Sequence, residues 1–187
     1  MQWIVTEIDG KVASIAADYR HFARIAAQVA ALPPDRTASV GTRKITTDEL
    51  TDFARTLRWD DLRLFGTPFQ LRVWKTLYEL PPRLYSYSEL AALSGTPQGV
   101  RPVAHVVAIN PVAYVIPCHL IVPKESLDKA VAIHAGAEGT LFKGADLYLL
   151  DHLDMGAYAY GPEVKRALIK RHLGAGNAVV DTNKPEE

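Results

Sequence analysis

Apolar positions near the N-terminus alternate with polar ones, and further along the chain they recur at helical spacing. The segment from Gln2 to Ala17 alternates loosely, with Asp9-Gly10 between its two apolar runs. Because Asp-Gly supplies the positive φ angles of a tight turn, two short antiparallel strands are expected here. Asp18 can cap a helix that Pro33-Pro34 would close, and the expected apolar face of that helix is Phe22, Ile25, Ala26 and Val29.

The next segment combines a polar stretch with a second helical pattern. Asp35 to Lys44 is polar and is predicted to be a loop. Thr46 and Glu49 have the spacing of a capping box, and the helix it opens has the stripe Leu50, Phe53 and Leu57. None of these residues points to chemistry. We interpret residues 1–65 as a small α/β supporting domain.

Helical signals become stronger after Gly66. Thr67-Pro68 is typical of a helix start, and Pro81-Pro82 ends the segment. The apolar stripe between them is Phe69, Val73, Leu77 and Leu80. A capping box at Ser86 and Glu89 opens a helix that ends at Ser94-Gly95, and Thr96-Pro97 starts another. Two short helices joined by a glycine-containing turn predict a helix-turn-helix.

The C-terminal half contains an apolar β-branched run and a basic helical pattern. The run NPVAYVIPCHLIV predicts a short strand, and a short helix is expected around Asp146 to His152. Between Glu163 and His172 the helical pattern carries more basic than acidic residues. We interpret it as a solvated or packing helix, with an added phosphate contact as the alternative. The tail from Ala175 is predicted to be disordered.

Composition excludes several classes of protein. The 187 residues carry 21 basic and 21 acidic side chains, so binding to nucleic acid has to use a local basic face. One cysteine allows neither an internal disulfide nor a multi-cysteine zinc site, and the six histidines lack the paired spacing of a metal helix. No secretion signal and no apolar stretch of about 18 residues is evident. We therefore expect a soluble, cytoplasmic protein (nucleoid-associated if bacterial, nuclear if eukaryotic) with no bound metal and no membrane partner.

The single cysteine has a neighbour that can activate it. A free cysteine is most often a buried packing residue. Cys118 is preceded by Pro117, which restricts the backbone, and is followed directly by His119. A thiol is nucleophilic as the thiolate, and an imidazole commonly takes its proton. The Cys-His dipeptide alone is a weak signal, because His119 can equally be a core histidine.

Four separated elements together are more specific. They are Ser86-Tyr87 followed by ELAAL, Arg101 within QGVRPVA, Asn110-Pro111-Val112, and Ile116-Pro117-Cys118-His119. In their order and spacing the chain resembles the alkylguanine-DNA alkyltransferases, also called methylated-DNA–protein-cysteine methyltransferases. The resemblance is firm from about Thr67 to Val122 and continues more weakly to Leu150.

The resemblance implies direct DNA repair without a cofactor. An alkyl group on the six-oxygen of guanine in double-stranded DNA moves irreversibly to Cys118, once per protein molecule. His119 would be the base that acts through water, and Asn110 would brace the turn before the cysteine. The implied fold is α/β, in which the small N-terminal domain is followed by a winged-helix-like DNA-binding domain with a helix-turn-helix and a short active-site strand. The predicted domains are residues 1–65, 66–155 and, for the basic helix and tail, 156–187, in a monomer.

The resemblance also implies how DNA is held. Tyr87 would help to rotate the target nucleotide out, and Arg101 would enter the stack in its place. Small residues, Gly99 and Ala104, would let the second helix enter the minor groove, which implies little sequence specificity. The substrate pocket would be formed by Ile121, Val107 and His134, with main-chain groups around Cys118 and Ile121 reading the guanine edge.

The chain departs from the family pattern at several positions. Leu120 stands where the family has an arginine, and His105 stands where it has a very small residue. Pro102 costs ~3 kcal/mol in a helix interior, unless it lies in the first turn. His134 would occupy the position of a substrate-contacting serine. Leu153 aligns with a glutamate that orients the histidine; Asp154 or Asp151 could replace it, and a shifted alignment explains the mismatch equally well.

Three other functions are compatible with parts of this pattern. The first is a damage sensor that flips alkylated guanine but transfers the alkyl group poorly or not at all. The second is a Cys-His thiol hydrolase, which lacks a recognisable oxyanion-hole loop and leaves Arg101 unexplained. The third is a winged-helix transcription regulator with an incidental cysteine, whose DNA binding would be indifferent to Cys118→Ala.

Overall fold

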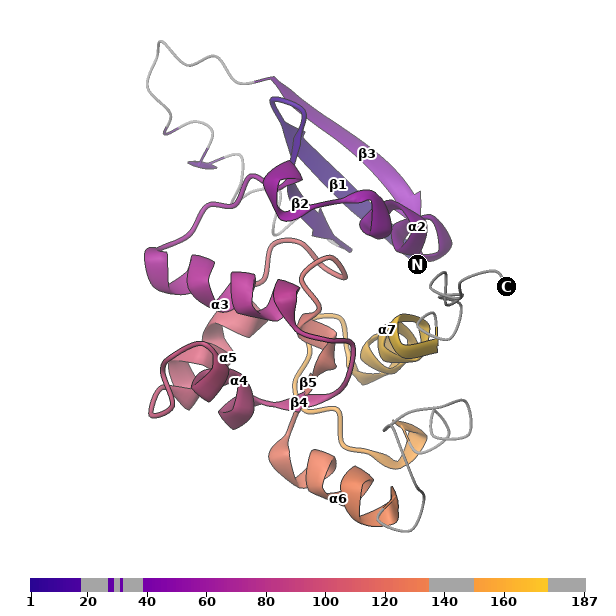
Figure 1. Ribbon diagram of the computed structural model, residues 1–187. Helices are drawn as coiled ribbons and strands as arrows, with labels where there is room; N and C mark the ends of the chain where they lie inside the picture. The colour runs from indigo at the N-terminus through magenta and orange to yellow at the C-terminus, as the bar shows by residue number, and fades with distance from the viewer. Residues whose placement is uncertain (18–26, 29–30, 32–38, 135–149, 175–187) are drawn as a thin grey trace, which may run out of the picture. The chain divides into compact units, whose positions relative to one another are not determined.

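The computed structural model describes residues 1–17, 27–28, 31, 39–134 and 150–174, and it shows a mixed α/β protein (Figure 1). The chain divides into two compact units. The first consists of Met1–Leu80 and Tyr87–Cys118, and the second of Pro81–Ser86 and His119–Glu187. The α/β class expected from the sequence is confirmed. Within the described residues, no helix is both long and apolar enough to cross a membrane.

The first unit begins with a three-stranded antiparallel sheet. Strand β1 (Gln2–Ile8) lies between β2 (Lys11–Ala16) and β3 (Val40–Thr46). The predicted hairpin is confirmed: Asp9 and Gly10 both have positive φ, 51° and 74°, as a tight two-residue turn requires. Of the helix expected after Asp18, residues 27–28 are described and are helical, whereas Phe22, Ile25, Ala26 and Val29 lie outside the described residues.

The loop predicted for Asp35 to Lys44 is wrong over its second half. Residues 40–44 belong to β3, which pairs with β1 along its whole length. Most of the side chains of β3 are exposed, because it is an edge strand. Its hydrogen bonds to β1 come from the backbone, so a polar composition does not prevent pairing and conceals the strand from pattern analysis.

Both predicted helices of the connecting region are present. Helix α2 (Thr47–Thr56) opens with the predicted capping box, in which Thr46 N donates to Glu49 Oε2 at 2.7 Å. Helix α3 (Pro68–Glu79) is capped by Thr67 and ends before Pro81, and its buried residues are Val73, Trp74 and Leu77. The Trp74 indole donates to the Val106 carbonyl at 3.0 Å, which fastens α3 to a later helix of the same unit.

The helix-turn-helix is confirmed as α4 (Tyr87–Leu93) followed by α5 (Val100–Ala108). These two helices pack against each other and against α3. Gly95 has a φ of 74°, and the amides of Gly95 and Thr96 donate to the carbonyls of Ala92 and Ala91. This is the Schellman arrangement, in which a left-handed glycine ends the helix.

The second unit is built around one apolar cluster. Short strands β4 (Tyr85–Ser86) and β5 (Ile121–Val122) pair in parallel and are followed by α6 (Lys124–His134) and α7 (Pro162–Gly174). Residues 150–152 form one helical turn, so the helix expected around Asp146 to His152 is observed in its described part. The cluster consists of Leu84, Leu120, Val122, Leu150, Leu153, Met155, Ile169 and Leu173.

The cysteine does not lie on a strand, contrary to the expectation. Cys118–Leu120 is a short 3-10 helix (η2), and the strand that follows has two residues. Pro117 cannot donate a ladder hydrogen bond, and Tyr114 has a φ of 72°, so the apolar run cannot stay extended. Apolar, β-branched composition alone does not reveal such a break.

Candidate active site

Asn110 braces the turn that leads to the cysteine. Its Nδ2 donates to the Ile116 carbonyl at 2.8 Å, and its Oδ1 accepts from the Val112 amide at 3.0 Å. The side chain is 7% exposed, so both bonds are shielded from water. One buried amide therefore joins the two ends of the turn, as the family resemblance implied.

A strained residue lies at the tip of the same turn. Tyr114 is buried and has a φ of 72°, a conformation that costs a bulky residue about 1–3 kcal/mol. The Ala113–Ile116 bridge and the bond from the Ile116 amide to the Val112 carbonyl hold the turn closed around it. Sequence reasoning missed this residue, because tyrosine is not a left-handed residue type and no local signal marks it.

Cys118 is a reduced thiol at the end of the first unit. It is 7% exposed, and its amide donates to the Ile116 carbonyl at 2.8 Å. That amide is therefore already engaged, and it is not a free donor for reading a base.

Tyr87, the first residue of α4, is electrostatically coupled to this thiol. Burial raises the pKa of Tyr87, and the charge of a Cys118 thiolate raises it further. The phenol consequently stays protonated at neutral pH and can donate a hydrogen bond. The structure thus brings two of the predicted residues into one electrostatic environment.

Helix α5 presents a polar face that begins at Arg101. The side chains of Arg101, Pro102 and His105 are exposed, and Ala104 is half-buried. No hydrogen bond or ion pair holds the Arg101 guanidinium within the part of the chain that is described. Pro102 is the third residue of the helix, where an amide has no intrahelical acceptor, so the proline is tolerated.

Two residues predicted to lie beside α5 have different surroundings from those expected. Gly99 is buried at the start of α5 and does not lie on its exposed face. A Cβ at this position would overlap the Thr96 side chain, so the tight turn itself requires the glycine. Val107, expected to line the substrate pocket, packs into the core with 6% exposure.

His119 starts the second unit and is completely buried. Its Nε2 lies 3.2 Å from Nδ1 of His172, and the two rings are tilted by 54°. Burial holds the pKa of His119 well below its usual value, and the charges of His172 and Lys165 lower it further. His119 is therefore a neutral imidazole at physiological pH, as a proton acceptor must be.

Lys165 is a buried cation in the same unit. Its Nζ donates to the carbonyls of Ile121 and Met155, both at 2.6 Å. Ile121 is also completely buried, and one lone pair of its carbonyl is thereby occupied. The lysine thus binds β5 and the segment before α7 to α7 itself.

Sequence reasoning did not identify Lys165 or His172 as site residues. A signal for them exists, since Lys165, Leu168, Ile169 and His172 follow the spacing of one helix face. The two apolar members of this stripe are buried, so α7 is the packing helix expected from the sequence. A lysine and a histidine on such a stripe indicate polar groups directed toward the interior.

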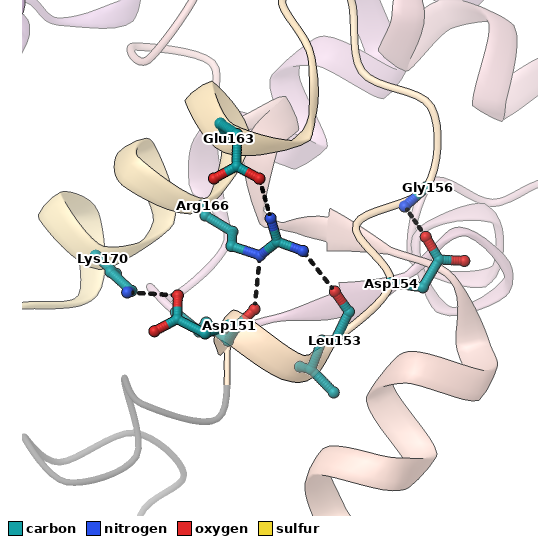
Figure 2. A network of polar contacts seen from close by, with 8 residues as sticks. Asp151, Leu153, Asp154, Gly156, Glu163, Arg166 and Lys170 are labelled. Carbon is teal, nitrogen blue, oxygen red and sulfur yellow. Dashed lines mark hydrogen bonds and ion pairs between the residues drawn. The ribbon is translucent and has the colours of Figure 1, made fainter.

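The two carboxylates considered as orienting groups for the histidine have other partners. Asp151 accepts from Lys170 at 2.7 Å, and that bond lowers the pKa of Asp151 (Figure 2). Asp154 accepts from the Gly156 amide at 2.8 Å (Figure 2). Leu153, which aligns with the family glutamate, belongs to the apolar cluster.

Leu120 and His134 are two further residues at which the chain departs from the family pattern. Leu120 is 1% exposed and packs into the apolar cluster of the second unit. His134 is the last residue of α6, and its side chain lies outside the described part of the structure. In the described ranges, no three His, Cys, Asp or Glu side chains are grouped so as to hold a metal ion.

Comparison with known proteins agrees with these observations. Residues 68–138 match the sequence profile described as "6-O-methylguanine DNA methyltransferase, DNA binding domain". A "Probable methylated-DNA--protein-cysteine methyltransferase" of Acanthamoeba polyphaga mimivirus is 45% identical over 67 residues, covering 35% of this chain and 45% of that protein. A "Methylated-DNA--protein-cysteine methyltransferase" of Mycobacterium leprae is 40% identical over 75 residues, covering 40% of this chain and 42% of that protein. The chain thus spans less than half the length of these relatives.

Solved structures with related names were also found. The Mycobacterium tuberculosis OGT in complex with DNA is 28% identical, with a TM-score of 0.44, over 60% of this chain and 54% of that one. The O6-methylguanine-DNA methyltransferase from Pyrococcus kodakaraensis is 21% identical, with a TM-score of 0.48, over 90% of both chains. On the sequence matches, residues 68–138 of this chain are similar to the 6-O-methylguanine DNA methyltransferase DNA-binding domain.

Proposed function

We propose that this protein repairs DNA directly, by moving an alkyl group from the six-oxygen of guanine to Cys118. One observation carries the proposal: the only cysteine of the chain follows the Asn110-braced turn and is coupled to Tyr87 at the start of the helix-turn-helix. A nucleophile so placed in a DNA-binding domain acts on a base of the bound DNA. The sequence matches to methylated-DNA–protein-cysteine methyltransferases support the same chemistry.

The reaction is a single displacement without a cofactor. His119, a neutral imidazole, takes the thiol proton through water, and the Cys118 thiolate attacks the alkyl carbon. The sulfur–carbon bond forms while the carbon–oxygen bond breaks, and the electron pair of the broken bond stays with the guanine. The guanine then takes up a proton at N1. The thioether cannot be reversed by this site, so each protein molecule acts once.

The DNA-binding residues act by extruding the target base. A base within a duplex cannot reach a thiol, and flipping it out costs a few kcal/mol. Arg101 is exposed on the first turn of α5 and is long enough to fill the vacated space, while the protonated Tyr87 contacts the flipped nucleotide. The ligand is double-stranded DNA with an alkylated guanine, approached from the minor groove by one protein monomer.

The decisive experiment is intact mass after incubation with a duplex that carries one 6-O-methylguanine. We expect wild type to gain one methyl group at Cys118 and the Cys118→Ala variant to gain none. Binding that prefers the lesion without any mass gain would replace the proposal with a damage sensor. Neither binding nor mass gain would refute both functions.

A further inference from the structure

We propose that His172, on the C-terminal helix α7, is a positioning residue that selects the tautomer of His119 and so makes it a base. The inference rests on the proposed function for its consequence, the activation of Cys118. It assigns a role in the site to a helix that lies beyond the family match, which ends at residue 138.

The contact between the two imidazoles sets the proton positions. His119 Nε2 and His172 Nδ1 are 3.2 Å apart, so one of them donates and the other accepts. If His119 Nε2 carries the proton, Nδ1 of His119 has a lone pair and can accept the thiol proton. If His172 Nδ1 donates instead, His119 carries its proton on Nδ1 and cannot act as a base there. The proposal requires the first arrangement, in which His172 accepts.

Helix α7 holds His172 firmly in this place. Arg166 donates to the Leu150 carbonyl at 2.9 Å and to the Leu153 carbonyl at 3.2 Å, and Figure 2 shows its guanidinium between α7 and that segment. Lys170 adds the ion pair with Asp151, and Lys165 adds two bonds to carbonyls. Polar contacts thus hold the helix on both sides of the buried Leu168 and Ile169. An orienting group needs such support, because a misplaced acceptor selects no tautomer.

The charges around His119 favour its neutral form. Lys165 is the cation that acts on His119 besides His172 itself, and both lie on α7. The nearby carboxylates of the 150–154 segment and α7 are committed elsewhere: Asp151 to Lys170, Asp154 to the Gly156 amide, and Glu163 to Arg166. A neutral acceptor such as the His172 imidazole therefore suits this site. Protonation of His172 converts its acceptor nitrogen into a donor and abolishes the arrangement.

Two substitutions separate the acceptor from the rest of the side chain. His172→Asn places an amide oxygen near the position of Nδ1 and does not titrate, whereas His172→Leu removes the acceptor. The matched control is His152→Leu, because His152 is an exposed histidine of the same unit. For all four proteins, the rate of Cys118 methylation is measured with methyl iodide, which needs no DNA, and with the 6-O-methylguanine duplex, from about pH 5 to 9. Urea unfolding checks that each variant is folded.

We expect His172→Leu to lower both rates at neutral pH by at least about tenfold, which is less than the ~10²–10⁴-fold for loss of a positioned base because His119 itself remains. His172→Asn should keep them within about threefold of wild type and shift the fall in rate at acid pH to lower pH, where His119 itself takes up a proton. His152→Leu should behave as wild type. Long-range 1H–15N spectra of wild type should show the His119 proton on Nε2.

The inference is overturned if His119 carries its proton on Nδ1, if His172→Leu retains the wild-type rates and pH profile, or if Asn and Leu at 172 impair the rates equally. The proposed function is tested separately by the duplex. If wild type takes no methyl group from DNA while its methyl iodide rate depends on His172 as described, the proposed function fails and the positioning role stands.

Discussion

Single buried polar side chains hold backbone segments in place within each of the two units. Asn110 accepts from the Val112 amide and donates a second hydrogen bond to the Ile116 carbonyl, and it does so where water has little access. His119 is kept neutral chiefly by burial, and the buried Lys165 donates to two backbone carbonyls. At the residue scale, the buried donors and acceptors of the backbone determine which polar side chain is needed at each position.

Replacing Asn110 with Ala should destabilise the first unit. The change leaves the Val112 amide buried without its partner, at a cost of about 1–3 kcal/mol, and it removes one of the two hydrogen bonds to the Ile116 carbonyl, which still accepts from the Cys118 amide. We expect the free energy of unfolding in urea to fall by roughly that amount, and Cys118 to react faster with thiol reagents as the turn opens. Asn110→Asp retains the acceptor but turns a carboxylate oxygen toward the Ile116 carbonyl, so it should be destabilised as well. An Ala variant as stable as wild type would contradict the bracing role.

The buried His119 should make stability depend on pH. Its pKa is lowered in the folded state, so the unfolded chain binds the proton more readily, and stability is lost as the pH falls below about 6.5. One such group contributes a slope of up to about 1.4 kcal/mol per pH unit. We expect His119→Gln to flatten the decline in unfolding free energy between about pH 6.5 and 5 relative to wild type. The exposed-residue variant His152→Gln is the control, and parallel curves for His119→Gln and wild type would refute the assignment.

At the scale of elements, α5 combines a buried and an exposed face. Val103, Val106 and Val107 face the core, while Arg101 and His105 lie one turn apart on the exposed side. The Trp74 indole fixes the helix through the Val106 carbonyl. The helix can therefore present Arg101 to DNA without depending on that side chain for its own packing.

Replacing Arg101 with Ala should impair base flipping and spare both folding and thiol chemistry. We expect the rate of methyl transfer from duplex DNA to fall about tenfold or more, since a few kcal/mol of unstacking is no longer offset. The methyl iodide rate and the urea midpoint should be unchanged. Lys44→Ala removes the same charge from exposed strand β3 and serves as the control. Equal losses in the two variants would assign Arg101 a merely electrostatic role.

At the scale of the whole molecule, the chain passes repeatedly between its two units. The peptide bond between Cys118 and His119 carries it from the first to the second, so the proposed nucleophile and base belong to different units but remain covalent neighbours. The second unit gathers its core from Leu84, from Leu120 and Val122, and from residues 150–173, which are far apart in sequence. Its integrity depends on α7.

Truncating Ile169 in α7 tests that dependence. Ile169 is completely buried in the apolar cluster, so Ile169→Ala should lower the unfolding free energy by about 2–5 kcal/mol. The duplex transfer rate should fall with it at temperatures where the second unit loosens. Ala167→Ser changes an exposed residue of the same helix and should have little effect. If Ile169→Ala retains wild-type stability, α7 is not part of this core.

Local signals in the sequence were sufficient for the hairpin, the capped helices and the helix-turn-helix. Asp9-Gly10, the Thr46–Glu49 box, Thr67-Pro68 and Gly95 each act within a few residues, so their consequences are visible without the fold. The order of Tyr87, Arg101, Asn110 and Cys118 similarly carried the family resemblance, and it is the basis for proposing Cys118 as the nucleophile.

Tertiary structure alone decided three other features. Strand β3 forms because the backbone of β1 offers hydrogen bonds to any side-chain sequence. The extended run ends at Tyr114, because Asn110 and the bridge behind it impose a backbone angle that tyrosine does not favour by itself. His172 reaches His119 across 53 residues, since the packing of α7 determines that distance and no local pattern encodes it. Short-range propensities are written in the sequence, whereas contacts between distant segments exist only once the core has formed.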